Sequence, residues 1–292
     1  MKLFNCFIVA LLLVISIHVN AQRVRLNGAL GLSAYYGDLI QGTPALQDVS
    51  PQMQLGATYD LKKQLRFRLG LAFMKVKAAD RNNVRIDYRE RNLSFSSNIF
   101  EFSPMIEYDF VSREEYFLVP YVYGGLGFFT YNPTTIDPNG QKVNLRDWST
   151  EGQGIAGINL GKSYGKSGFS IPFGIGIRYE LSEDLSIGAE FNVRRTFTDY
   201  IDDVSSNAYP DPVLLAAAKP GAERLSYRGY ELGVGFPGVS RPRGNSRQKD
   251  IYYSLQFAIT YRLANFRLGR DLDFYGGTGQ SRKRVRNPRY VL

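Results

Sequence analysis

The chain contains about eight segments in which apolar and polar residues alternate, and residues 250–263 show the pattern most clearly. The apolar positions there are Ile251, Tyr253, Leu255, Phe257, Ile259, Tyr261 and Leu263, and the intervening ones are Asp250, Tyr252, Ser254, Gln256, Ala258, Thr260 and Arg262. Because strand side chains alternate between two faces, each segment has one apolar and one wet face. A soluble sandwich turns such apolar faces inward, whereas a membrane barrel turns them toward lipid.

The lengths of the connections decide between these folds. Strands are predicted at about 25–38, 52–61, 65–73, 100–110, 116–131, 169–181, 185–194 and 250–263, and the fifth is apolar on both faces, so periodicity does not orient it. The connections alternate long, short, long, short, long, short, long, and outer-membrane barrels sort their loops in this way. We therefore predict an all-β, eight-stranded antiparallel transmembrane outer-membrane β-barrel with long external loops and both termini in the periplasm.

The two ends of the chain predict a division into three parts. Lys2 precedes an apolar stretch over residues 7–17, and Val19-Asn20-Ala21 resembles a cleavage site. This pattern is typical of a secretory signal peptide, although an uncleaved anchor is an alternative. We expect a signal peptide at 1–21, the barrel at 22–263 and a basic periplasmic tail at 264–292, with outer-membrane lipid as the surroundings.

The composition excludes several kinds of chemistry. The only cysteine, Cys6, and the only histidine, His18, both lie in the predicted signal peptide. A mature chain without them has no Ser-His-Asp triad, no Cys-His pair and no typical zinc site. We predict no enzyme activity, no catalytic or metal-binding residues, no cofactor and no small-molecule substrate. The net charge of +9 is often a sign of nucleic-acid binding, but export argues against a nucleic-acid partner.

Charged residues occupy the wet faces of the predicted strands and are expected inside the barrel. They are Arg66, Arg68, Glu101, Glu107, Asp109, Arg178, Glu180, Glu190 and Arg194. Eight strands leave room only for side chains, and opposite charges can pair there into a satisfied polar plug. A path for ions or protons is the functional alternative.

Almost thirty residues follow the last predicted strand, and their charge is strongly basic. The candidate partner-binding residues are Arg267, Arg270, Arg282, Lys283, Arg284, Arg286 and Arg289. The tail is expected either to be a solvated end or to bind an acidic periplasmic partner or the glycan wall.

A group of carboxylates follows the seventh predicted strand, at Asp199, Asp202 and Asp203. Three aspartates can hold Ca²⁺ through oxygen ligands, but these do not match an EF-hand loop. A hydrogen-bonded rim is the favoured interpretation. Nothing in the chain specifies a sugar cleft for glycoside hydrolysis, and the loop glycines do not form a phosphate cradle.

Five strings in this order resemble the PorG-like outer-membrane barrels of the Bacteroidota: residues 36–39 (YGDL), 91–95 (RNLSF), 120–121 leading to 128–129, 150–154 (TEGQG) and 198–205 (TDYIDDVS). The motif positions are Tyr36, Gly37, Asp38, Arg91, Ser94, Phe95, Glu151, Gly152, Gln153, Gly154, Asp199, Tyr200, Asp202 and Asp203.

The resemblance implies a role in the type IX (Por) secretion system. PorG-like barrels are non-enzymatic and anchor a periplasmic ring, made of a PorK-like lipoprotein and a PorN-like subunit, to the outer membrane. Such anchoring supports protein transport and, in some species, gliding motility. The resemblance supplies no catalytic residues. A small barrel acting as a passive pore, adhesin or solute-binding protein is the alternative, and a lipid-modifying enzyme is a third hypothesis.

Overall fold

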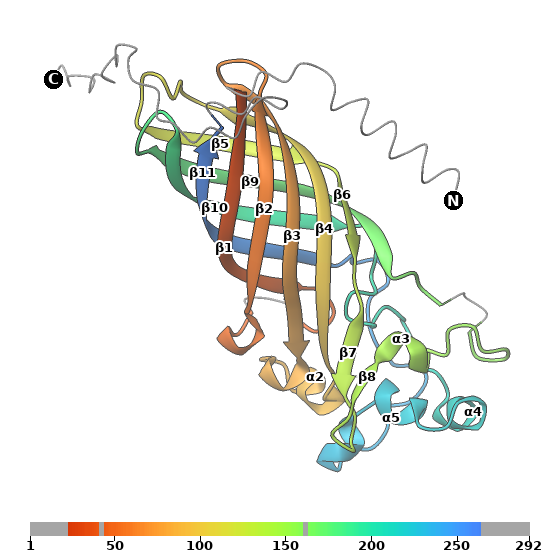
Figure 1. The fold of residues 1–292 in the computed structure, drawn as a ribbon. Coiled ribbons are helices and arrows are strands. Elements are labelled where there is room, and N and C mark those ends of the chain that lie inside the picture. Colours follow the sequence, from red (N-terminus) through yellow and green to blue (C-terminus); the bar gives the residue numbers. More distant parts are fainter. Residues whose placement is uncertain (1–22, 41–43, 160–162, 264–292) are drawn as a thin grey trace, which may run out of the picture.

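A computed structural model describes residues 23–40, 44–159 and 163–263 of the chain, so the predicted signal peptide and basic tail lie outside the described residues. The chain forms a closed antiparallel ring of eight strands (Figure 1). They are β1 (Val24–Tyr36), β2 (Ser50–Asp60), β3 (Leu65–Ala79), β4 (Ser94–Asp109), β5 (Leu118–Gly125) with its continuation β6 (Gly127–Thr130), β9 (Ser167–Glu180), β10 (Leu185–Thr196) and β11 (Ile251–Arg262). Each pairs with its neighbour in sequence, and β1 pairs with β11. The predicted eight-stranded β-barrel is confirmed.

Apolar side chains cover the outside of this ring. Leu30 on β1, Ile175 on β9 and Phe257 on β11 are 67%, 63% and 76% exposed. Their strand neighbours point inward and are mostly polar, as Gln256 beside Phe257 illustrates. A continuous apolar band of this kind is costly in water and suits the hydrocarbon core of a bilayer. The apolar faces therefore point outward, as a membrane barrel requires, and not inward as in a sandwich.

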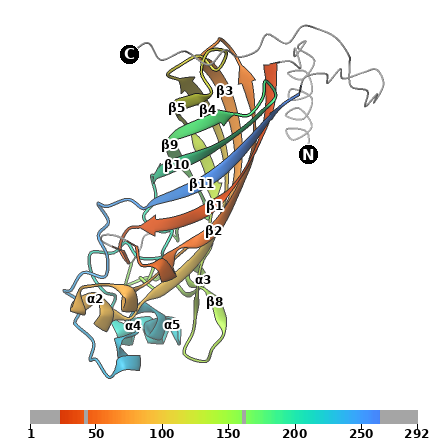
Figure 2. The same ribbon diagram turned by 90° about the vertical axis from the view of Figure 1, so that its left-hand side faces the viewer.

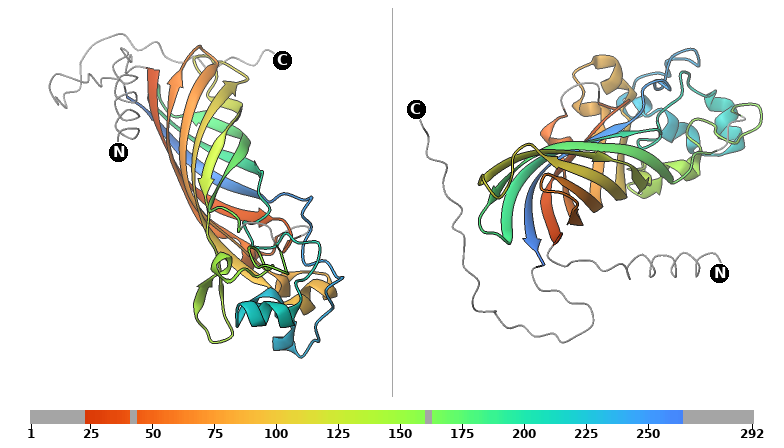
Figure 3. Two further views of the ribbon diagram at one scale, coloured as in Figure 1. Left: turned by 90° about the vertical axis from the view of Figure 1, so that its right-hand side faces the viewer. Right: turned by 90° about the horizontal axis from the view of Figure 1, so that it is seen from above.

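The two ends of the barrel differ. At one end, called the turn end here, short turns over residues 61–64, 110–117 and 181–184 join the strands. At the other, the loop end, the long connections fold into a layer that we call the cap, made of residues 37–40, 80–93, 131–159 and 197–250 (Figures 2 and 3). Among the described residues, no helix has both the length and the hydropathy to cross a membrane.

The cap contains short elements only. They are β7 (Pro133–Ile136), β8 (Lys142–Asn144), α2 (Ile86–Arg91), α3 (Leu145–Trp148), α4 (Pro212–Ala218), α5 (Ala222–Ser226), and the 3-10 turns η3 (Asp80–Asn82) and η4 (Gly229–Leu232); a further turn, η2 (Leu46–Asp48), precedes β2. Asp211 begins α4 by accepting hydrogen bonds from the backbone of Val213 and Leu214. The helices gather beyond the loop end (Figure 1).

Strands β3 and β4 extend further than the alternation predicts, to Ala79 and back to Ser94 instead of Phe73 and Phe100. The pattern inverts in this extension, with Lys75 exposed on the outer face and Met74 buried inside. A hairpin that rises out of the hydrocarbon needs a polar outer face and an apolar inner one. The predicted boundaries followed the lipid-facing pattern and therefore ended at the wrong residues.

The structure shows which side chains of the fifth predicted strand, residues 116–131, point into the barrel. Tyr121, Tyr123 and Phe129 point into the barrel and are buried. Their rings have space because the residues opposite Tyr121 and Tyr123 on β9 are Gly176 and Gly174. A Cβ atom on Gly176 would lie 2.3 Å from Cζ of Tyr121, so this close approach requires glycine.

Candidate functional site: a sealed lumen and a cross-linked cap

All nine charged side chains that the alternation places inside the barrel are buried there, with at most 9% exposure. Glu107 lies among three arginines, accepting hydrogen bonds from Arg178 (2.6 Å), Arg66 (2.9 Å) and Arg68 (3.2 Å). Arg66 also binds both carboxylate oxygens of Asp109. Buried charges are tolerated only when they are paired in this way.

A second junction lies around Glu190 of β10. Both of its oxygens meet the Arg68 guanidinium, at 2.7 and 2.9 Å. The Tyr121 hydroxyl and the Gln256 amide donate to the same carboxylate, each at 2.6 Å. The network thus crosses the barrel interior from β3 to β10 and reaches β5 and β11.

The third junction is Glu101 of β4, nearer the loop end. Arg194 donates to it at 2.9 Å, Ser170 at 2.9 Å and the Tyr252 hydroxyl at 2.6 Å. The Tyr252 ring packs edge-on against Phe129. Tyr252 therefore joins the polar network to an apolar layer above it.

Apolar side chains close the loop end of the lumen, which the sequence did not predict. Tyr35, Val76, Phe129 and Ile201 are fully buried there with their neighbours. The layer combines the inverted extension of β3 and β4 with residues of the cap. Water and ions could pass through the lumen only if both this apolar layer and the charge network beneath it opened.

Four of the five motif strings meet in the cap or at its rim, and Arg91 makes the first connection between them. Its Nε and Nη2 each donate to the Asp80 carboxylate at 2.7 Å, and Nη2 also reaches the Asp38 carbonyl at 3.1 Å. Nη1 donates to the carbonyl of Arg243. One guanidinium thus joins the segments after β1, β3 and β10.

Arg243 makes the second connection. Its Nη1 donates to Oε1 of Glu151 (2.8 Å) and to the carbonyl of Asp203 (2.7 Å), and its Nε donates to the carbonyl of Ser226 (3.1 Å). Oε1 of Glu151 also accepts from the backbone of Ser205 at 2.8 Å. Two buried arginines therefore hold all four segments of the cap together.

The other motif positions support the same junction. Phe95 packs edge-on against Tyr35, and Tyr200 stacks on Tyr164 with ring centroids 4.5 Å apart. The remaining positions lie on the cap or its rim. The Ser94 and Thr135 hydroxyls share a hydrogen bond, Gln153 accepts one from the Glu151 backbone, and Gly152 and Gly154 have positive φ. Tyr36 is the last residue of β1, and Gly37 follows it and forms a β-bridge with Ile40. Four of the five strings therefore build the cap and its rim, whereas the string at 120–121 and 128–129 lies in β5 and β6 of the barrel wall.

Acidic groups of the cap hold their protons unusually well. Burial raises the pKa of Asp199 to about 7, although Ser205 acts in the opposite direction. Burial also raises the pKa of Asp203 to about 6, against the lowering effect of Arg243. Asp202 and Asp250, which are fully buried, have pKa values well above the usual range because of burial first, and then because Asp250 repels Asp202 and Asp199 repels Asp250.

Sequence reasoning missed the residues that bind these motifs together. Arg243 is one of several arginines in a Pro- and Gly-rich loop, and Asp80 is one charge in a charged stretch. Nothing in their local patterns separates them from solvated neighbours. Their role depends on contacts between segments far apart in the chain.

Of the three aspartates that suggested Ca²⁺, Asp202 and Asp203 accept hydrogen bonds from separate protein groups, whereas both carboxylate oxygens of Asp199 are buried without a hydrogen-bond partner. Asp203 accepts from Thr150 and from Tyr164 (2.6 Å), and Asp202 accepts from Tyr35 (2.6 Å). Within the described part of the chain, no group of three or more His, Cys, Asp or Glu side chains is placed to hold a metal ion. Asp202 and Asp203 are thus hydrogen-bonded within the protein, and the predicted hydrogen-bonded rim does not extend to Asp199.

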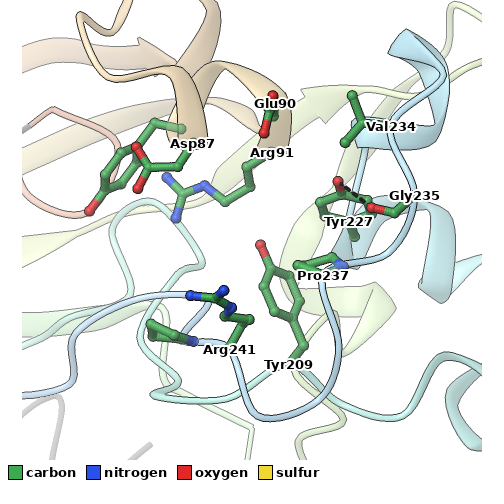
Figure 4. Close-up of a pocket in the computed structure, with 11 residues that line it drawn as sticks. Asp87, Glu90, Arg91, Tyr209, Tyr227, Val234, Gly235, Pro237 and Arg241 are labelled. Carbon is green, nitrogen blue, oxygen red and sulfur yellow. Dashed lines mark hydrogen bonds between the residues drawn. The ribbon is translucent and has the colours of Figure 1, made fainter.

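The outer surface of the cap carries a cavity of about 430 Å³ (Figure 4). Glu90 of α2 lies on one side of it and Arg241 on another, with Tyr209 and Tyr227 in its wall (Figure 4). The Tyr227 hydroxyl donates to the Gly235 carbonyl at 3.0 Å, which fixes the adjoining loop. The cavity has the size of a small-molecule site and both signs of charge at its edge.

Ring closure, antiparallel neighbours, an apolar exterior and a charged interior together define an outer-membrane type of β-barrel. The chain belongs to the family described as "Domain of unknown function (DUF6089)", whose model matches residues 4–212. That description contains no assignment to PorG-like barrels or to type IX secretion.

Several solved structures are similar to the chain, at low identity and with TM-scores below 0.5. Neisserial surface protein A is 8% identical with a TM-score of 0.41, over 82% of this chain and 96% of its own. The outer-membrane protein OprG of Pseudomonas aeruginosa is 9% identical with a TM-score of 0.38, over 82% and 95%. A major outer-membrane protein of Thermus thermophilus is 14% identical with a TM-score of 0.37, over 82% and 98%. No curated protein matches the chain.

Proposed function

We propose that this protein is a non-enzymatic structural component of the outer membrane that acts as a closed anchor. The observation that supports this best is the filled lumen, where paired charges such as Arg68 and Glu190 lie beneath an apolar layer containing Phe129 and Ile201. A barrel sealed in two ways is suited to holding a position in the membrane and poorly suited to conduction.

Planar-bilayer recordings test the closed state. The folded protein is expected to give no conductance steps above those of protein-free lipid. Heat-dependent migration on SDS gels checks, on the same sample, that the barrel is folded. Regular conductance steps from folded protein would favour the passive-pore alternative and contradict the proposal.

We further propose that the anchor serves the type IX secretion system and holds a periplasmic ring of a PorK-like lipoprotein and a PorN-like subunit. The order of the motif strings supports this role. Four of those strings build the cap and its rim, at the end of the barrel opposite the short turns. In outer-membrane barrels the long loops face outward and the short turns face the periplasm. We therefore propose that the periplasmic ring contacts the turn end and the basic residues of 264–292.

Pull-down from detergent-solubilised outer membrane tests this role. Full-length protein is expected to recover the ring proteins, and deletion of 264–292 to reduce both recovery and cargo export. A matched variant keeps the length but replaces Arg282, Lys283, Arg284 and Arg286 by Gln, which separates charge from length. Unchanged recovery in both variants would contradict the role of the tail, and failure of the full chain to recover ring proteins would contradict the secretion role.

The cap cavity favours a second candidate function, the binding of a small polar solute. Its lining combines Glu90, Arg241 and tyrosine side chains, which offer hydrogen-bond donors and acceptors. Equilibrium dialysis against mixed sugars and amino acids is expected to show binding that Glu90→Gln with Arg241→Met abolishes. Equal retention by the variant and the original protein would exclude this cavity as the site.

A further inference from the structure

Three polar groups meet at the rim where the cap joins the barrel. The Tyr35 hydroxyl, at the end of β1, lies 2.6 Å from Oδ2 of Asp202 and 2.8 Å from Oδ1 of Asp250. All three side chains are at most 1% exposed. Asp202 follows β10 and Asp250 immediately precedes β11, so one phenol contacts both ends of the longest loop, residues 197–250.

We infer that Asp202, Tyr35 and Asp250 share one extra proton, and that this proton latches the loop 197–250 to the barrel rim. In this state one of the two carboxyl groups is a neutral acid and the other a carboxylate. The latch goes beyond the anchoring role proposed above, and its test does not depend on that role.

Counting hydrogen bonds leads to this proton. A phenol has one hydrogen to donate and two lone pairs. The backbone N–H of Asp38 donates to the Tyr35 oxygen at 3.1 Å and uses one lone pair. The phenol donates its one hydrogen to one of the two carboxylates. The other carboxyl group lies at a distance typical of an O–H···O hydrogen bond, so it must carry a proton of its own and donate it to the phenol oxygen.

The two carboxyl oxygens that do not face Tyr35 limit where the proton can lie. Oδ1 of Asp202 accepts from the backbone N–H of Val204 at 2.9 Å. Oδ2 of Asp250 accepts from the backbone N–H of Ile201 at 2.8 Å. Both are occupied as acceptors. The proton therefore belongs on one of the two oxygens that face Tyr35.

The surrounding charges favour the protonated state. Asp38 from the β1 side faces both acids, and Asp199 from the β10 side faces Asp250. Among the nearby cations, Arg91 and Arg243 interact with Asp38, and Lys249 interacts with Asp199. Within the described part of the chain, neither Asp202 nor Asp250 forms an ion pair. Two carboxylates without a cation in a buried site repel each other, and retaining a proton removes that repulsion.

The latch makes attachment of the cap depend on pH. While the proton is present, a continuous chain of hydrogen bonds runs from Asp202 through Tyr35 to Asp250. When it leaves, two negative charges face one phenol, and only one of them can accept its hydrogen. The loop near Ile201 and Val204 then loses its hold on β1, so the cap loosens as pH rises.

Infrared difference spectroscopy on folded, full-length protein detects the proton directly. The measurement is made above the pKa values of Asp199 and Asp203, so that these acids are ionised. We expect a carbonyl band of a protonated carboxylic acid that shifts in D₂O. Asp202→Asn and Asp250→Asn should each abolish the band, because an amide donates to Tyr35 without needing a proton. Asp87→Asn, which alters an exposed carboxylate, should leave it unchanged.

Amide hydrogen exchange of Ile201 and Val204 provides the second readout. After correction for intrinsic rates, and above the pKa values of Asp199 and Asp203, protection should fall with rising pH in the original protein and stay constant in the two Asn variants. If neither variant folds, ¹³C NMR titration of aspartate carboxyl groups in the unaltered protein takes their place and should show one acid still protonated. Absence of a protonated carboxyl signal from this site would overturn the inference.

Discussion

Arg68 and Glu190 meet across the interior of the barrel from β3 and β10, with a two-pronged contact at 2.7 and 2.9 Å. Residues 122 positions apart are thereby joined through the lumen and not through the wall. Both side chains are at most 3% exposed. The pair therefore braces two strands that make no backbone contact with each other.

Arg68→Met should destabilise the folded barrel by about 3–5 kcal/mol, because it leaves the Glu190 carboxylate buried beside Tyr121 without its cation. Adding Glu190→Gln should recover most of this loss, since no unpaired charge remains. Urea unfolding of protein reconstituted in lipid vesicles measures both values. Equal stability of the single and double variants would show that the pair does not act as described.

Gly176→Ala should destabilise the barrel by about 1–3 kcal/mol, because the new methyl group would overlap the buried ring of Tyr121. Gly28→Ala is the matched control, since that glycine also lies within a strand but has nothing within 4 Å of an added Cβ. The same urea titration compares the two. A similar loss for both variants would indicate a general effect of strand glycines.

Arg243→Met should loosen the cap while the barrel stays folded. The substitution leaves Glu151 without its buried cation and removes the bonds to the Asp203 and Ser226 carbonyls. We expect about 3–5 kcal/mol less stability for the cap and faster proteolysis of loop 197–250. Arg241→Met changes an exposed arginine two positions away and should leave the rate near its original value. Equal rates for both variants would argue against the junction.

The cap should be more stable in acid than at neutral pH. Asp199 and Asp203 have folded-state pKa values of about 7 and about 6, above the usual value of 3.8. A raised folded pKa contributes stability that is fully present below the unfolded value and lost as pH rises through the folded one. Stability of the cap should therefore fall between about pH 4 and pH 7.

Hydrogen exchange of cap amides at several pH values, corrected for intrinsic rates, measures this dependence. Asp199→Asn should flatten the part of the curve near neutral pH, because the titrating group is gone. Asp147→Asn, at a half-exposed carboxylate, should keep the original slope. A cap that became more stable with rising pH would refute the assignment of raised pKa values.

The fold was predictable because a barrel in lipid repeats one simple pattern. Alternation such as that of Gln256 and Phe257 reflects contacts with hydrocarbon outside and charges inside, and both are visible in a single strand. The prediction lost accuracy where the surroundings changed. At Met74 and Lys75 the strand leaves the hydrocarbon and the pattern inverts, so the predicted boundary came too early.

For the cap, the sequence showed only that several motif strings stand out, and it did not show which residues they contact. Asp38, Arg91 and Glu151 stood out in the sequence, but their neighbours in space did not. Arg243 lies in a loop whose composition is typical of solvated segments, and only long-range contacts make it central. Local patterns contain no information on such contacts, because each partner is in a separate connection between strands.

Closure of the ring has a consequence for how the molecule is made. Tyr36 lies opposite Ile251 and Arg25 opposite Arg262, so the first strand can find its second neighbour only when the last one has been synthesised. Before then, β1 and the strand made most recently would present unpaired backbone groups, which hydrocarbon does not tolerate. Biogenesis must therefore keep the nascent polypeptide out of the bilayer until translation is complete, and insertion and completion of the ring must be coupled.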